Sequence, residues 1–422
     1  MTFAADAAAA PATPTKHYAW LVFALTFGLL VSDYMSRQVL SAVFPLLRAE
    51  WSLSDGQLGA LSSIVALMVG LLTLPLSALA DRFGRSRSLV IMALLWSLAT
   101  AACAVARDYQ EMFWARFMVG VGEAAYGSVG IAVVLGVFPK SLRATLTGAF
   151  MAGGLFGSML GVSLGGAVAG AMGWRPAFGI MALVGIALSA AYALCINDRR
   201  LAAAGAEPAN AAVPQARGGF ASLFATGSVF AAYLGSGLQL FICAAIPAWA
   251  PSFLNRYYDI EPGRAAVLAA GFILVGGVGM VLGGIVNDIL VRRAPGRTAA
   301  YAAAICLTSG VLLLAAFQLP TGWTQLGLIA TGLFVGAAIP GPAGAMVANL
   351  TDPKVHGSAF ATLTLANNFL GLAPGAYVTG LLADRLGGLL ESLQLIPVTC
   401  LVAGSLFLAV TRRYGHDLER RP

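Results

Sequence analysis

The sequence predicts an all-α polytopic membrane protein in which twelve transmembrane helices form two six-helix bundles. The 422-residue chain is 59% hydrophobic and only 10% charged, with a mean hydropathy of +0.83, whereas a soluble domain is about a quarter charged. Its apolar runs continue for about 20 residues, the length at which an α-helix spans a bilayer. They lack the alternating pattern of a membrane β-barrel. A polar break near the middle divides the runs into two sets of six.

The predicted helices follow one another closely within each half. The first six lie near residues 19–44, 56–80, 87–106, 110–137, 146–171 and 176–196. The second six lie near residues 222–252, 264–288, 298–318, 325–349, 357–382 and 390–411. The resulting organisation is a disordered tail over 1–18, an N-terminal bundle over 19–196, a linker over 197–221, a C-terminal bundle over 222–411 and a second tail over 412–422. The first tail lacks the basic start and short apolar core of a signal peptide.

The basic residues of the loops indicate the orientation. With both termini in the cytoplasm, 17 of the 25 basic residues lie in inner loops and tails, six lie in outer loops and two lie within helices. The positive-inside rule favours this arrangement. We therefore expect a multi-pass protein of a bacterial-type inner (plasma) membrane. The net charge of +7 faces the anionic inner leaflet and needs no nucleic acid as a partner.

Arg116 and Glu123 lie inside the fourth apolar run, where a charge costs several kcal/mol and rarely persists without a function. Their spacing of seven places them two turns apart on one helix face, with Gly120 between them. Asp33 and Arg37 lie similarly inside the first run. Alternatives are a buried Arg116–Glu123 ion pair that only locks two helices together, and a self-neutralising Asp33–Arg37 pair one turn apart.

These four groups predict ion coupling by the N-terminal half. Burial and a nearby arginine change the proton affinity of a carboxylate in opposite directions, so a cavity that opens to each side in turn can load and release a proton. We expect Glu123 and Asp33 to couple protons, and Arg37, Arg116 and Tyr34 to act as substrate or charge partners. The C-terminal half contributes neutral candidates for lining the cavity, namely Gln239, Asn349, Asn367, Asn368 and Tyr377.

An internal repeat supports the division into two halves. Asp81 and Arg85 follow the second run, and Asp288 and Arg292 occupy the equivalent places after the eighth. Carboxylates and guanidinium groups at helix ends can pair across two bundles in one state and separate in another. We therefore interpret these four residues, together with Arg82, as a conformational latch, although a solvated basic loop would show the same pattern.

Several motifs resemble those of the major facilitator superfamily, whose halves are parallel six-helix repeats. Residues 77–87 resemble its loop signature glycine-x-leucine-alanine-aspartate-arginine-x-glycine-arginine, with Ser77 in place of the glycine. Residues 116–124 match its fourth-helix motif, Arg-Phe-Met-Val-Gly-Val-Gly-Glu-Ala. Residues 157–166 resemble a motif associated with antiporters, except that Val162 replaces its proline. The resemblance implies the major facilitator fold over about 19–411.

Within that superfamily the chain is most similar to bacterial spinster-like transporters. The similarity rests on residues 36–41 with Pro45, residues 53–59 and residues 120–124. The first-helix motif of that family is asparagine-tyrosine-x-aspartate-arginine, where this chain has Asp33-Tyr34-Met35-Ser36-Arg37. The carboxylate has moved by three residues and can remain on much the same helix face. Organic-anion symporters of the superfamily share a similar first helix.

Prolines predict bends in the seventh, tenth and eleventh helices, in the C-terminal half. Five of them lie within predicted spans, namely Pro247, Pro251, Pro340, Pro342 and Pro374. Broken helices are tolerated at membrane depth where the backbone lines a cavity. We therefore expect residues 339–342 to form a cavity wall or gate.

Together these features predict a secondary active transporter that works by alternating access, is proton-coupled and moves an organic anionic or amphipathic, lysolipid-like solute. The alternatives are an organic-anion/proton symporter and a drug-type efflux antiporter. No clustered nucleophile, phosphate-binding loop or metal-ligand spacing points to an enzyme, and the five cysteines are spaced as packing residues. We expect no cofactor and no metal, with the solute, protons and the bilayer as partners of a monomer.

Overall fold

A computed structural model of the chain describes residues 16–198, 201, 223–224, 226–352 and 355–419. The described residues are almost entirely helical, and no strand is present among them. The predicted tail over 1–18 and linker over 197–221 lie mostly outside this part of the chain.

The N-terminal half contains α1 (Lys16–Trp51), α2 (Asp55–Phe83), α3 (Arg85–Val105), α4 (Tyr109–Glu123), α5 (Tyr126–Val137), η1 (Lys140–Leu142), α6 (Arg143–Met172) and α7 (Trp174–Cys195). The C-terminal half contains α9 (Gly227–Tyr258), α10 (Pro262–Arg293), η3 (Pro295–Arg297), α11 (Thr298–Gln318), α12 (Trp323–Gly336), α13 (Pro340–Leu350), α14 (His356–Asn367), η5 (Asn368–Leu372), α15 (Ala373–Leu386), α16 (Leu389–Leu395) and α17 (Val398–Glu419). Helix α17 continues into the residues predicted as a tail from 412.

All twelve predicted spans are present as helical segments. Eleven of them form helices long and apolar enough to cross a membrane. The remaining span, predicted over 357–382, is divided among α14, the wide π-helical turns of η5, and α15. The predicted all-α architecture of twelve spans is therefore confirmed.

The fourth span of each half is interrupted near its middle. In the N-terminal half α4 ends at Glu123 and α5 begins at Tyr126. In the C-terminal half α12 ends at Gly336 and α13 begins at Pro340, where a proline without an N–H can start a helix. Helix α9, by contrast, continues through Pro247 and Pro251. The break in the first half places Glu123 at a helix end inside the bundle.

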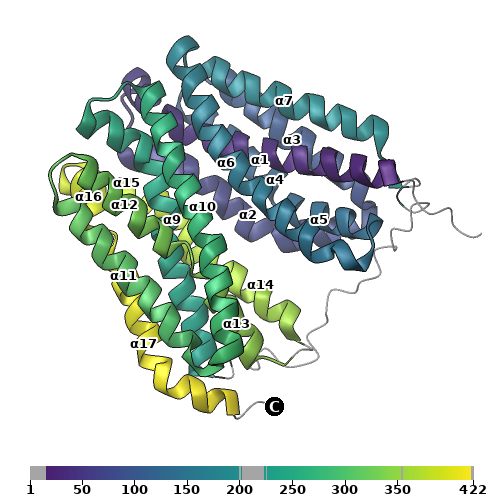
Figure 1. Cartoon of the computed structure of the whole chain (residues 1–422). Coiled ribbons are helices and arrows are strands. Elements are labelled where there is room, and N and C mark those ends of the chain that lie inside the picture. The colour runs from purple at the N-terminus through teal and green to yellow at the C-terminus, as the bar shows by residue number, and fades with distance from the viewer. Residues whose placement is uncertain (1–15, 199–200, 202–222, 225, 353–354, 420–422) are drawn as a thin grey trace, which may run out of the picture.

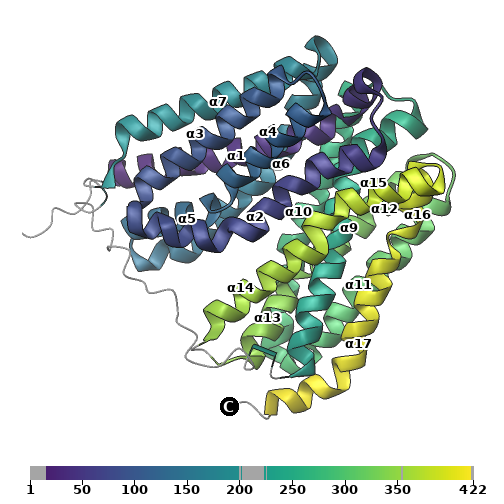
Figure 2. The ribbon, with the colours of Figure 1, turned by 180° about the vertical axis from the view of Figure 1, so that it is seen from behind.

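The two halves form separate bundles, with α1–α7 in one and α9–α17 in the other (Figure 1). We call the end that carries the connections at 52–54, 259–261 and 387–388 the distal end, and the end that carries Lys16 and Glu419 the terminal end. The bundles lie close together at the distal end and diverge toward the terminal end, as the opposite view also shows (Figure 2).

Glycines allow α2 and α15 to approach closely near the distal end. A Cβ at Gly59 would collide with the carbonyl of Ala376, and a Cβ at Gly380 would collide with the carbonyl of Asp55. Small residues at such crossings let two backbones touch. The closed distal end therefore depends on these two positions.

Candidate transport site

A buried charged cluster joins α1 to α4 in the N-terminal half. The Arg37 Nε donates a hydrogen bond to the Glu123 Oε2 over 2.9 Å, and the Arg37 Nη2 lies 2.7 Å from the same oxygen. The Glu123 side chain is fully buried, whereas 21% of the Arg37 side chain is exposed. Glu123 lies on the same face of α4 as Arg116, which is two turns earlier, and this face packs against α1.

Asp33 lies in the same cluster and interacts electrostatically with both Glu123 and Arg37. With both carboxyl groups ionised, the buried Asp33 Oδ1 and Glu123 Oε1 have no hydrogen-bond donor, whereas a proton on one of the groups lets the two side chains hydrogen-bond to each other. Among the described residues no salt bridge joins Asp33 to Arg37, so the expected pair one turn apart on α1 is not formed. Within this cluster, two carboxyl groups therefore lie near a single guanidinium group that pairs with a carboxylate, that of Arg37. Such an arrangement is suited to holding a proton.

Arg116 lies two turns before Glu123 on α4 and is fully buried. Its guanidinium group donates to the carbonyl of Ser36 at 3.0 Å, of Arg37 at 3.1 Å and of Leu61 at 3.4 Å. The alternative Arg116–Glu123 ion pair is absent among the described residues, since Glu123 pairs with Arg37. The role of Arg116 as a substrate or charge partner stays a prediction. Through its hydrogen bonds to the three carbonyls, its planar guanidinium group holds α1 and α2 against α4 and positions Arg37.

We expect Arg116→Lys to lower thermal stability, since a lysine keeps the charge but can reach fewer of the three carbonyls. Hydrogen bonds to charged groups contribute about 1.5–3 kcal/mol each, so the loss should lower the melting temperature by several degrees. Thermal unfolding of the purified protein in detergent measures this. The matched control is Arg107→Lys in the exposed connection before α4. Equal melting temperatures for the two variants would contradict the anchoring role.

A central cavity of about 340 Å³ lies between the two bundles, beside the cluster. Helix α1 contributes Tyr34 and Gln38 to its wall, and α6 contributes Ser158. The Arg37 guanidinium carbon lies 5.3 Å from the centre of the Tyr34 ring, which favours a cation–π contact. Tyr34 therefore connects the charged cluster to the cavity.

The neutral residues predicted to line the cavity from the C-terminal half do not line it. Gln239 is fully buried, and its Nε2 lies 3.4 Å from the Ser309 Oγ inside the C-terminal bundle. Asn349 donates toward the Tyr414 hydroxyl group, and Asn368 donates to the carbonyl of Thr364. These two, like Asn367, are absent from the cavity wall. Asn368 nevertheless packs against Gly70 of α2 in the other bundle, outside this cavity.

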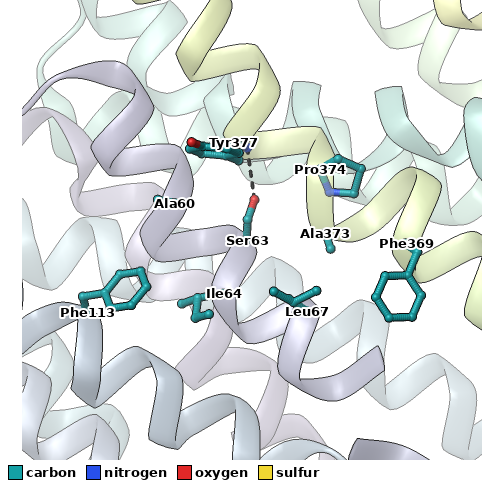
Figure 3. A pocket seen from close by; sticks show the side chains of 9 residues that line it. All are labelled: Ala60, Ser63, Ile64, Leu67, Phe113, Phe369, Ala373, Pro374 and Tyr377. Atoms are coloured by element: carbon teal, nitrogen blue, oxygen red, sulfur yellow. Dashed lines mark hydrogen bonds between the residues drawn. The ribbon is translucent and has the colours of Figure 1, made fainter. Parts of the chain in front are cut away.

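Tyr377 instead borders a second, mainly apolar pocket of about 450 Å³ between α2 and α15 (Figure 3). Its backbone N–H donates to the Ser63 Oγ over 3.0 Å. Phe113 of α4 and Phe369 of η5 lie at the two ends of this pocket (Figure 3). The pocket offers apolar surface and the hydroxyl groups of Tyr377 and Ser63, and no charged side chain lines it.

At the distal end a charged network joins the two bundles. Arg256 of α9 binds both carboxylate oxygens of Asp55, at 2.6 and 2.8 Å, and Arg48 of α1 adds a contact of 3.0 Å. Where α2 crosses α15, the Asp384 carboxylate accepts hydrogen bonds from the backbone N–H groups of Asp55 and Gly56, at 2.9 and 2.8 Å. We call Arg48, Asp55, Arg256 and Asp384 the distal network.

Sequence reasoning missed the distal network. The available signal was the capping box at the start of α2, where Ser54 and Gln57 cap each other's backbone. A capped helix start exposes N–H groups and attracts a carboxylate. That the carboxylate comes from Asp384, 328 residues away from Gly56, could be known only from the fold.

The predicted latch residues lie at the terminal end. Asp81 pairs with Arg85 at 2.9 Å within the same half. Arg82, Asp288 and Arg292 are exposed, and among the described residues no ion pair crosses between the bundles at this end. The latch stays a prediction for a conformation in which the terminal end closes.

Asp384→Asn should favour opening of the distal end, because an amide replaces the charged acceptor of two N–H groups. Losing charge-assisted hydrogen bonds of about 1.5–3 kcal/mol each shifts a two-state equilibrium roughly tenfold or more. Spin labels at positions 107 and 321, on exposed connections of opposite halves, would measure the distance by pulsed electron resonance in a cysteine-free background. Asp259→Asn is the control, since its left-handed backbone (φ 54°) suits asparagine. An unchanged distance distribution in Asp384→Asn would contradict the role of Asp384 in keeping the distal end closed.

Two six-helix bundles, closed at one end around a central cavity with buried charges at its side, define a transporter fold rather than an enzyme. The family model described as "Major Facilitator Superfamily" matches residues 26–376. The chain belongs to this superfamily and is a membrane transporter.

Its relatives include two kinds of transporter. The chain is 29% identical over 325 residues to the "Probable L-galactonate transporter" of Escherichia coli, covering 74% of this chain and 71% of that protein. It is 24% identical over 396 residues to the "Probable sphingolipid transporter spinster homolog 2" of Arabidopsis thaliana, covering 88% and 80%. The crystal structure of a bacterial homologue of the human lysosomal transporter Spinster, inward-facing and unoccupied, superposes with a TM-score of 0.85 at 20% identity, covering 96% of this chain and 99% of that one. The predicted similarity to spinster-like transporters is therefore confirmed.

Proposed function

We propose that this protein moves an organic anion together with a proton by alternating access. The observation that carries the proposal is the Arg37–Glu123 ion pair beside the central cavity, with Asp33 as a second carboxyl group. Arg37 is the partly exposed cation of this cluster, and guanidinium groups bind carboxylates in a well-defined planar geometry. The L-galactonate transporter among its relatives supports an organic acid as the class of solute.

In this mechanism Glu123 and the solute compete for the same guanidinium group. When Glu123 is ionised it occupies Arg37, and a carboxylate solute finds no free cation. When Glu123 takes up a proton it releases Arg37, which can then bind the solute. Proton and anion therefore bind together, which makes the cycle a symport. The proton can be shared with Asp33, because the two carboxyl groups interact.

We also propose an orientation for the cycle. If both termini are cytoplasmic, as the basic loops predict, the distal end faces outward and this structure is inward-facing. The distal network then closes the outer gate, and the predicted latch of Asp81, Arg82, Arg85, Asp288 and Arg292 closes the inner one. The protein acts as a monomer in a bacterial-type inner membrane, with its N-terminal bundle at 19–196 carrying the coupling groups.

A second candidate solute is an amphipathic, lysolipid-like molecule. The apolar pocket between α2 and α15 favours it, because an acyl chain would find apolar contacts there (Figure 3). The relative described as a sphingolipid transporter supports the same class.

Reconstituted liposomes test the proposed function. Counterflow of labelled L-galactonate, of 3-phenylpropionate and of lysophosphatidylcholine, each against protein-free liposomes, identifies a carried class without requiring a proton gradient. An inward-directed proton gradient should then drive accumulation of the carried acid several-fold above equilibrium. A carried acid that never accumulates with the gradient would contradict proton coupling. Transport of the neutral amide of an acid, without transport of the acid itself, would contradict an anionic solute.

A further inference from the structure

The wall that the C-terminal bundle contributes to the central cavity offers few hydrogen-bonding groups. Its side chains are aliphatic, aromatic or sulfur-containing, and they include Leu240, Cys243, Phe272, Met280 and Leu333. A thiol and a thioether are weak hydrogen-bonding groups. Pro247 has no N–H, so the carbonyl of Cys243, four residues earlier in α9, lacks its helical donor and can accept one hydrogen bond. The side chains of this wall thus bury a solute against carbon and sulfur, and the hydrogen-bond acceptors of the wall are limited to backbone carbonyls.

The opposite wall carries the polar groups. Tyr34 and Gln38 of α1 face the cavity on either side of Arg37 along the helix. Ser158 of α6 lies there as well, but its Oγ already donates to the carbonyl of Gly154 over 2.8 Å. The cavity is therefore asymmetric, with its polar side chains on α1 and α6 and an apolar side on α9, α10 and α12. Arg37 precedes Gln38 on α1 and is not itself one of the lining residues.

This asymmetry separates two classes of organic acid. A sugar acid carries several hydroxyl groups along its whole length, and each one buried without a partner weakens binding by about tenfold or more. An aromatic or branched aliphatic body has no such groups and gains from leaving water. The volume of about 340 Å³ lies near the lower end of small-molecule sites, which span about 300–1,000 Å³.

We propose that the solute is a small carboxylate with an apolar, aromatic or branched aliphatic body, and that the wall formed by α9, α10 and α12 excludes polyhydroxylated sugar acids. This inference rests on the proposed binding of a carboxylate by Arg37. It excludes the sugar acid named for one of the transporters that the chain resembles.

Ligand binding to the purified protein tests the inference with 3-phenylpropionate, its neutral amide 3-phenylpropanamide, galacturonate and lysophosphatidylcholine. We expect 3-phenylpropionate to bind at least about tenfold more tightly than galacturonate. Equal or tighter binding of galacturonate, preferential binding of lysophosphatidylcholine, or binding of neither acid would each overturn the inference. The amide examines the proposed function separately, because an amide that binds as tightly as the acid contradicts the role of Arg37 whatever the wall prefers.

A substitution in the wall provides the second measurement. Met280→Gln places a hydrogen-bonding amide of similar size on α10, and it should reduce the preference for 3-phenylpropionate over galacturonate by about 3- to 10-fold. The control is Met172→Gln, at the exposed distal end of α6 and outside the described cavity walls, which should leave the preference unchanged. If both variants keep the wild-type preference, the wall does not select the solute and the inference is wrong.

Discussion

Glu123→Gln should abolish proton-driven accumulation of the solute while leaving exchange across the membrane. A glutamine keeps the size of the side chain but cannot take up or release a proton. It also removes the anion that occupies Arg37, at 2.7 Å in this structure, so that the arginine stays available to the solute. Uptake driven by a proton gradient should fall to the level of protein-free liposomes, and counterflow should remain measurable and lose its dependence on pH.

The matched control for this experiment is Glu50→Gln. Glu50 forms an ion pair of the same length, 2.7 Å, with Arg175 at the distal end of the N-terminal bundle, far along α1 from the cluster. The control should keep gradient-driven uptake, because it breaks a comparable pair outside the coupling site. Uphill uptake retained by Glu123→Gln would contradict the assignment of Glu123 as the proton carrier.

Asp33→Asn should reduce transport about tenfold or more. Asp33 is 3% exposed and interacts with both Glu123 and Arg37, so its loss removes the second carboxyl group that can share the proton. Initial rates of gradient-driven uptake measure the effect. Asp108→Asn serves as the control, since Asp108 caps the start of α4 and asparagine caps a helix equally well.

A second substitution should restore part of this activity. In the double variant Asp33→Asn with Ser36→Asp, the carboxylate occupies the place that it has in the spinster-like motif. Positions 33 and 36 are about 60° apart around a helix, and the Ser36 hydroxyl group is buried without a hydrogen-bond partner. Full activity of Asp33→Asn alone would show that Asp33 has no part in coupling and would leave Glu123 as the candidate.

The membrane class, the twelve spans and the family could be predicted from the sequence, because each depends on local properties. Hydropathy over about 20 residues decides whether a segment spans the bilayer, and charges within such segments stand out because they are costly. Asp33, Arg37, Arg116 and Glu123 were found in this way. The prolines marked positions where a helical N–H is missing, but only the fold showed that one span is interrupted before Pro340 whereas α9 continues through Pro247 and Pro251.

The partners of these residues depended on tertiary structure. Glu123 pairs with Arg37, 86 residues away, rather than with Arg116 on its own helix, because α4 packs against α1 and Arg116 binds backbone carbonyls there. Arg116 binds backbone carbonyls, which every residue has and no sequence pattern marks. Asp384 reaches the start of α2 because Gly59 and Gly380 let two distant helices touch. Sequence thus determined which helices form and which charges they carry, whereas helix packing decided which charges meet and which faces line the cavity.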